Sequence, residues 1–73
     1  MNQDIPIEVK RQILQQKLQI HRQGYYAHQI DAQVAQDIGG MEQVVEQAKE
    51  NMARAQKFID KLEELLTAIA AKE

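Results

Sequence analysis

Apolar residues recur every seven positions through the second half of the chain. One column of this heptad pattern starts at Met41, a second starts at Val44, and a third, starting at Val45, widens the stripe on one side. The three columns contain Met41, Ala48, Ala55, Leu62, Ile69, Val44, Phe58, Leu65, Val45, Met52, Ile59 and Leu66. Such a thickened stripe predicts a helix over about 41–71 that suits a helical bundle better than a strict two-stranded coiled coil.

The first half of the chain carries two apolar stripes where one would be enough. At ~100° per residue the stripes lie roughly 150° apart around a helix. One stripe contains Ile7, Leu14, Leu18, Tyr25 and Ala32, and the other contains Val9, Ile13, Ile20, Ala27, Ile30, Val34 and Ile38. A helix in an isolated hairpin needs only one stripe, so the second stripe predicts packing against a further helix.

Proline and glycine mark the ends of the two predicted helices. Pro6 suits the first turn of a helix, where its missing N–H has no partner anyway. The N-cap is then Asp4 or Ile5, with Asp4 favoured chemically. Gly39 and Gly40 reach left-handed backbone angles without a Cβ clash, so they predict a sharp break. We therefore expect an all-α, coiled-coil-like antiparallel hairpin as a single domain over 1–73, with helices at about 5–38 and 41–71 and a turn at 39–40.

The position of the turn sets which residues of the two helices face each other. It places Leu18 near Leu62, and Gly24 and Tyr25 near Ala55, so small residues meet at the middle and large ones toward the open end. The expected hairpin core consists of Leu14, Leu18, Tyr25, Ala48, Ala55, Phe58, Leu62, Leu65, Leu66 and Ile69. This core should be thickest at the end away from the turn.

The second stripe of the first helix is the expected interaction surface. Gly24 costs about 1 kcal/mol relative to alanine inside a helix, and close packing would justify that cost. Tyr26 is either a partner contact, since aromatic residues are enriched at interfaces, or an ordinary surface aromatic. The predicted interface residues are Val9, Ile13, Ile20, Gly24, Ala27, Ile30, Val34 and Tyr26.

The size of the chain favours assembly. A chain of 73 residues without cysteine is marginal alone and lacks disulfides, so association is the expected source of further stability. The leading hypothesis is a homodimer that forms a four-helix bundle and acts as a scaffold, adaptor, small chaperone or regulator. Asn51, a polar residue at a d-type position, could set register or oligomer number. A helical partner from another protein is the runner-up.

Catalytic chemistry finds little support in the sequence. There is no serine or cysteine, Thr67 is the only threonine, and no Glu-x-x-His motif is present. His21 and His28 are seven residues apart, which is ~10 Å along a helix and too far to share one metal ion within a chain. We expect no enzymatic activity, no metal and no cofactor, with both histidines at the border of a helix interface.

Nucleic-acid binding through the first helix is the alternative function. Its candidate face consists of Lys10, Arg11, Lys17 and Arg22, together with neighbouring glutamines. Tyr25, Tyr26 and His28 could stack on bases. The net charge of −2 and the proximity of Asp31 and Asp37 make this electrostatic footprint weak.

The expected location is the cytoplasm, without membrane contact. The sequence after Met1 contains no apolar signal region, and no segment approaches the ~20 apolar residues that cross a bilayer.

Overall fold

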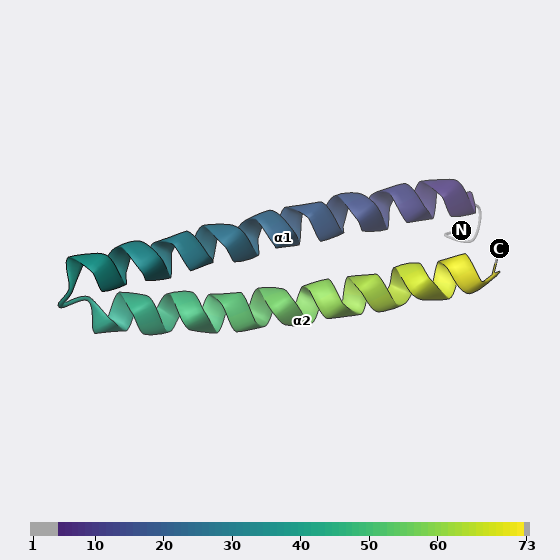
Figure 1. Ribbon diagram of the computed structural model, residues 1–73. Helices are drawn as coiled ribbons and strands as arrows, with labels where there is room; N and C mark the ends of the chain where they lie inside the picture. The colour runs from purple at the N-terminus through teal and green to yellow at the C-terminus, as the bar shows by residue number, and fades with distance from the viewer. Residues whose placement is uncertain (1–4, 73) are drawn as a thin grey trace.

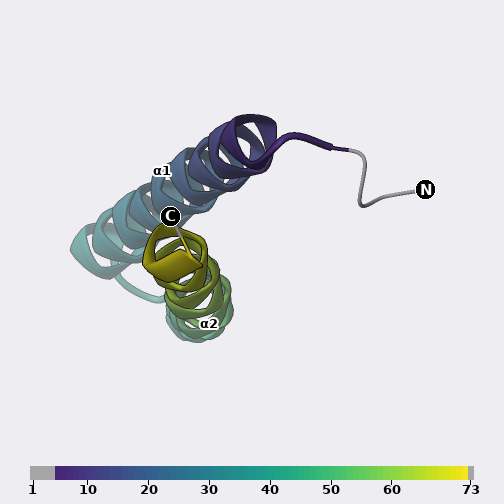
Figure 2. The same cartoon turned by 90° about the vertical axis from the view of Figure 1, so that its right-hand side faces the viewer.

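The computed structural model describes residues 5–72 as two long α-helices joined by a tight turn (Figure 1). Helix α1 spans Ile7–Ile38 and helix α2 spans Glu42–Lys72. The helices run antiparallel along their whole length and form a rod of 52 × 19 × 15 Å. Viewed end-on, their axes are inclined to each other, as is usual for packed helices (Figure 2). The predicted all-α hairpin is thus confirmed, and residues 5–72 contain no β-strand.

Both helices begin slightly later than the sequence pattern predicts. Pro6 has an extended backbone, with φ −59° and ψ 148°, and its carbonyl accepts the Lys10 N–H at 3.1 Å. Pro6 is therefore the N-cap of α1, which corrects its predicted place in the first turn; Asp4 lies outside the described residues. Similarly, the Met41 carbonyl accepts the Val45 N–H at 3.1 Å, so α2 begins at Glu42.

The turn uses the conformational freedom of both glycines. Gly39 has φ 82° and Gly40 has φ 71°, in a region that other L-residues rarely adopt. The Gly39 N–H donates to the Ala35 carbonyl at 3.1 Å and thereby caps the end of α1. Both glycines thus lie in the break between the helices, which also includes Met41.

The core between the helices is thin and graded in side-chain size. Its buried residues are Leu18, Ala32, Ala35, Ala48, Ile59 and Leu62. The three large ones form a cluster against which Leu14, Tyr25 and Leu66 pack. In the half of the core near the turn, the buried residues are alanines instead. The contact of Leu18 with the Leu62 cluster and the thicker open end agree with the predicted register.

Two predicted core residues lie outside this core. Phe58 is 54% exposed and Leu65 is 42% exposed, whereas the neighbouring Ile59 is only 6% exposed. The apolar stripe of α2 has three columns, and one partner helix is too narrow to cover them all. The column that contains Phe58 and Leu65 therefore remains at the side of the hairpin. Ala35, which was not predicted as core, is buried because it faces the turn half of α2.

Candidate protein interface

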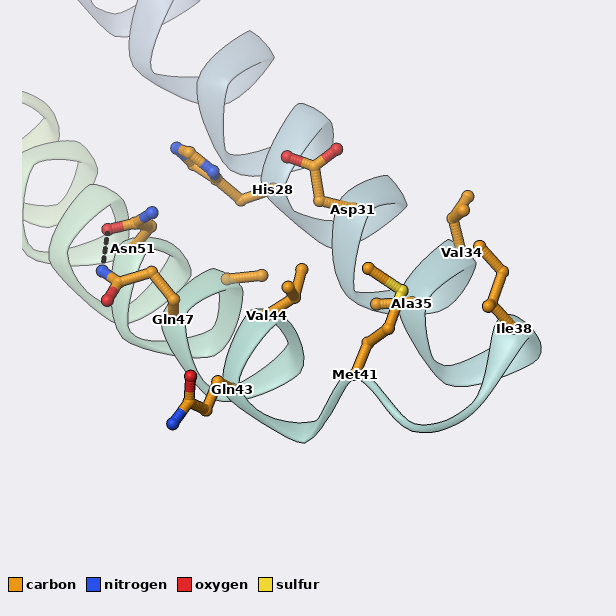
Figure 3. Close-up of a pocket in the computed structure, with 11 residues that line it drawn as sticks. His28, Asp31, Val34, Ala35, Ile38, Met41, Gln43, Val44, Gln47 and Asn51 are labelled. Atoms are coloured by element: carbon orange, nitrogen blue, oxygen red, sulfur yellow. Dashed lines mark hydrogen bonds between the residues drawn. The ribbon is translucent and has the colours of Figure 1, made fainter.

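An open groove of about 600 Å³ lies between the helices next to the turn (Figure 3). Its walls come from both helices and consist of His28, Asp31, Val34, Ala35, Ile38, Met41, Gln43, Val44, Gln47, Ala48 and Asn51. Figure 3 shows the apolar side chains gathered toward the turn, while His28 and Asn51 lie at the other end of the groove. The groove identifies one side of the hairpin on which apolar groups of α1 and α2 meet.

Heptad spacing extends this side along the full length of the hairpin. Counting back from Val34 in steps of seven gives Ala27, Ile20 and Ile13 on α1, and counting on from Val44 gives Asn51, Phe58 and Leu65 on α2. We call these eight residues the groove face. Its large apolar side chains are between 41% and 62% exposed. The groove face is therefore a long apolar strip with no covering helix in the hairpin itself.

A ring stack lies at the edge of the groove face. The His21 and Phe58 rings are 4.8 Å apart between centroids, with an interplanar angle of 21°. His21 is half-buried and covers part of Phe58, while the rest of the phenyl ring stays exposed. The stack shows that residue 21 of α1 lies level with residue 58 of α2. Within residues 5–72, no group of three His, Asp or Glu side chains lies close enough to hold a metal ion.

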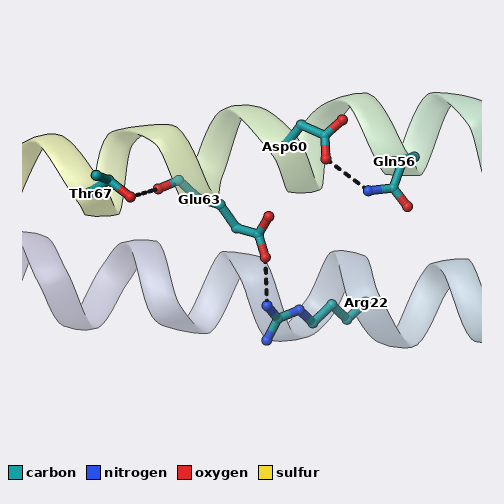
Figure 4. Close-up of polar contacts among 5 residues, drawn as sticks. All are labelled: Arg22, Gln56, Asp60, Glu63 and Thr67. Carbon is teal, nitrogen blue, oxygen red and sulfur yellow. Dashed lines mark hydrogen bonds and ion pairs between the residues drawn. The ribbon is translucent and has the colours of Figure 1, made fainter.

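Polar contacts join side chains away from the groove face (Figure 4). Arg22 of α1 donates to the Glu63 carboxylate of α2 at 2.8 Å, and Gln56 donates to Asp60 at 2.8 Å. The Arg22 and Glu63 side chains are about half-exposed, so this bridge contributes at most about 1 kcal/mol. One side of the hairpin thus carries an ion pair between the helices, whereas the groove face carries mainly apolar side chains.

Half of the predicted interface residues fall on the groove face. Ile13, Ile20, Ala27 and Val34 belong to it by definition, and Val9 and Ile30 form the next column outward. Tyr26 is 62% exposed but projects more than ~100° around α1 from the column of Ala27. The structure therefore does not bring Tyr26 to the groove face.

Gly24 is not explained by packing inside the hairpin. A Cβ atom built at this position meets no heavy atom within 4 Å, so the expected close approach to Ala55 is absent. The position is half-buried and lies in a heptad column that adjoins the groove face. A side chain at residue 24 would enter open space on that side of α1.

The four basic residues of the nucleic-acid hypothesis do not form one surface. Lys10 and Lys17 project from the edge of the groove face, whereas Arg11 and Arg22 lie roughly 100–150° away around α1. Arg22 is also paired with Glu63. A single straight nucleic-acid backbone would therefore meet only part of the set.

Comparison with protein-family models, with curated proteins and with solved structures finds no match for this chain. In the part of the chain that the structure describes, neither helix is long and apolar enough to span a membrane.

Proposed function

We propose that the protein is a non-enzymatic assembly module whose hairpins associate in pairs through the groove face to give a four-helix bundle. The observation that carries this proposal is the convergence of exposed apolar residues from both helices on one side of the hairpin. Ile20 and Val34 come from α1, and Phe58 and Leu65 come from α2. Contiguous apolar surface of this kind marks a binding site for another protein surface.

The surface area of the chain supports burial of one side against a partner. The chain exposes 5754 Å², while a compact folded monomer of 8.4 kDa should expose about 4,600 Å². The excess of about 1,100 Å² compares well with the ~800 Å² that each partner buries in a stable interface. The radius of gyration of the chain is 16.4 Å, which likewise exceeds the ~11 Å of a compact domain of this length.

The thin core gives the second line of support. Among the residues that the structure describes, three of the six buried ones are alanines, and none of these side chains is less than 2% exposed. Two helices alone bury too little apolar area to offset much of the entropy lost on folding. A second hairpin laid on the groove face would create a four-helix core and place Phe58 and Leu65 inside it.

The composition supports a role without catalysis. The chain has no serine or cysteine nucleophile, and the hydroxyl of Thr67 donates to the Glu63 carbonyl within its own helix at 2.9 Å. The groove next to the turn is open to solvent and lined mainly by aliphatic and amide side chains. Such a surface suits helix packing better than it suits substrate chemistry.

Sedimentation equilibrium of the purified chain over a range of concentrations tests the proposal. We expect a mass of twice 8.4 kDa, falling toward 8.4 kDa only on strong dilution. A chain that stays at 8.4 kDa at high micromolar concentration would contradict self-association. It would instead favour a helical partner from a different protein.

A further inference from the structure

A charged heptad column borders the groove face on α1. It consists of Lys10, Lys17, Gly24, Asp31 and Ile38, and Asp31 and Ile38 line the groove itself. Gly24 stands at its centre, with Lys17 seven residues before it and Asp31 seven residues after it. A twofold axis near Gly24 would therefore bring the lysine of one copy to the aspartate of the other, twice in each dimer.

None of the three central residues has its role explained within a single hairpin. In residues 5–72 neither Lys17 nor Asp31 takes part in an ion pair, and both side chains are exposed. Gly24 faces open space. Glycine destabilises a helix by about 1 kcal/mol relative to alanine, and no contact within the hairpin requires glycine at this position. Close approach of a second backbone is one physical reason for a glycine at such a position.

From this arrangement we infer that the second copy docks with its α1 antiparallel to the first, about a twofold axis that crosses α1 between Gly24 and Ala27. The inference rests on the proposed dimer and adds its orientation and register. Gly24 of one copy faces Ala27 of the other, which lets the helices come close at the axis. The facing pairs further out are Ile13 with Ile38, Lys17 with Val34, and Ile20 with Asp31. The Lys17 ammonium group then lies one helical turn from the other copy's Asp31.

Helix α2 points independently to the same axis. The stack of His21 on Phe58 aligns the helices, so the level between Gly24 and Ala27 corresponds to residues 53–54 of α2. The groove-face column of α2, from Val44 to Leu65, has its midpoint between Asn51 and Phe58, at residues 54–55. The two centres agree to within about one residue, or ~1.5 Å along the helix. One axis, to within about one residue, therefore places Val44 opposite Leu65 and brings Lys17 to within one helical turn of the other copy's Asp31.

A parallel arrangement would lose this complementarity. Lys17 would face Lys17, Asp31 would face Asp31, and no opposite charges would meet along the column. Like charges across a helix interface disfavour that pairing, and opposite charges set partner orientation. The charge order along α1 thus selects the antiparallel dimer.

Charge exchange tests the ion pair. Lys17→Glu and Asp31→Lys should each raise the dimer dissociation constant roughly tenfold, because each disturbs two symmetry-related pairs. The double variant should return to near the wild-type value. Lys49→Glu, on the opposite side of the hairpin, makes the same charge change as Lys17→Glu and should have no effect. A double variant as weak as the single variants would overturn the pairing.

Cysteine cross-linking tests the orientation directly, because the chain contains no native cysteine. Mixed under oxidising conditions, Lys17→Cys and Val34→Cys chains should form a mixed disulfide. Ile20→Cys alone should not cross-link, because the two cysteines of a dimer would lie ~16 Å apart along the direction of the α1 helices. Self-cross-linking of Ile20→Cys in a chain that sediments as a dimer would overturn the antiparallel register and leave the dimer standing. A monomeric mass for the wild-type chain would instead overturn the proposed function.

Discussion

Replacing Ile20 should separate assembly from folding. Ile20 lies in the middle of the groove face and is 62% exposed in the hairpin, so it contributes little to the core between α1 and α2. Glutamine is similar in length and forms helices at least as well as isoleucine. Ile20→Gln should therefore leave the hairpin intact while placing a polar amide where the second copy packs.

The size of the effect follows from the exposed fraction. Full burial of an isoleucine side chain contributes about 1.5–3 kcal/mol, and 62% of this residue's surface is still available for burial. The available gain is thus about 1–2 kcal/mol for each chain and about 2–4 kcal/mol for a symmetric dimer. At about 1.4 kcal/mol for each tenfold change, the dissociation constant should rise by a factor of about 30 to 800.

Tyr26 supplies a matched control for this measurement. It is also 62% exposed, but it projects from a different side of α1. In sedimentation velocity runs over a concentration series, Tyr26→Gln should dimerise like the wild type, while Ile20→Gln should be mostly monomeric at the same concentrations. Circular dichroism should show both variants to be helical. Equal dissociation constants for the two variants would refute the assignment of the groove face as the interface.

Three other substitutions test separate parts of the structure. Gly24→Leu should keep the hairpin folded, because no atom lies within 4 Å of the added Cβ, yet weaken the dimer in gel filtration; an unchanged elution volume would count against close helix approach. Gly40→Ala should cost about 1–2 kcal/mol in urea unfolding, because Gly40 has φ 71°, and an unaffected midpoint would argue against this turn geometry. Leu62→Ala should lower stability by about 2–5 kcal/mol, visible as a large drop in thermal midpoint, since Leu62 lies in the main cluster. A loss below about 1 kcal/mol there would mean that the cluster is not the core.

The hairpin itself could be predicted because its signals are local. The heptad columns of α2 specify a helix, and Gly39-Gly40 can adopt positive φ where other residues resist it. The helix starts were harder, since Pro6 and Met41 each have a carbonyl that accepts the first helical hydrogen bond. Whether a residue lies just inside or just outside a helix depends on its ψ angle, which the residue type alone leaves open.

The division of the α2 stripe between core and surface was not predicted. Phe58 and Ile59 are adjacent in sequence and differ by ~100° around the helix, but both belong to the apolar stripe. Only the rotation of α2 against α1 decides that Ile59 is buried and Phe58 is exposed. That rotation depends on the helix crossing and on the sum of all contacts between the helices. It therefore cannot be predicted from any single residue.

The groove face also needed the three-dimensional arrangement. The sequence indicates a second apolar stripe on α1 but not the side to which α2 folds back. The structure shows Val34 and Val44 in one groove, which places the second stripe and the Phe58 column on the same side. The free space at Gly24 is a further property that spacing alone misjudged, because it predicted contact with Ala55.

Isotope-filtered nuclear Overhauser measurements on a mixture of labelled and unlabelled chains would test the central claim most directly. Contacts between different chains should appear for the side chains of Ile13, Ile20, Val34, Phe58 and Leu65, and none should appear for Tyr26. A spectrum in which those five side chains contact only their own chain would contradict the proposal that a second hairpin covers this side of the molecule.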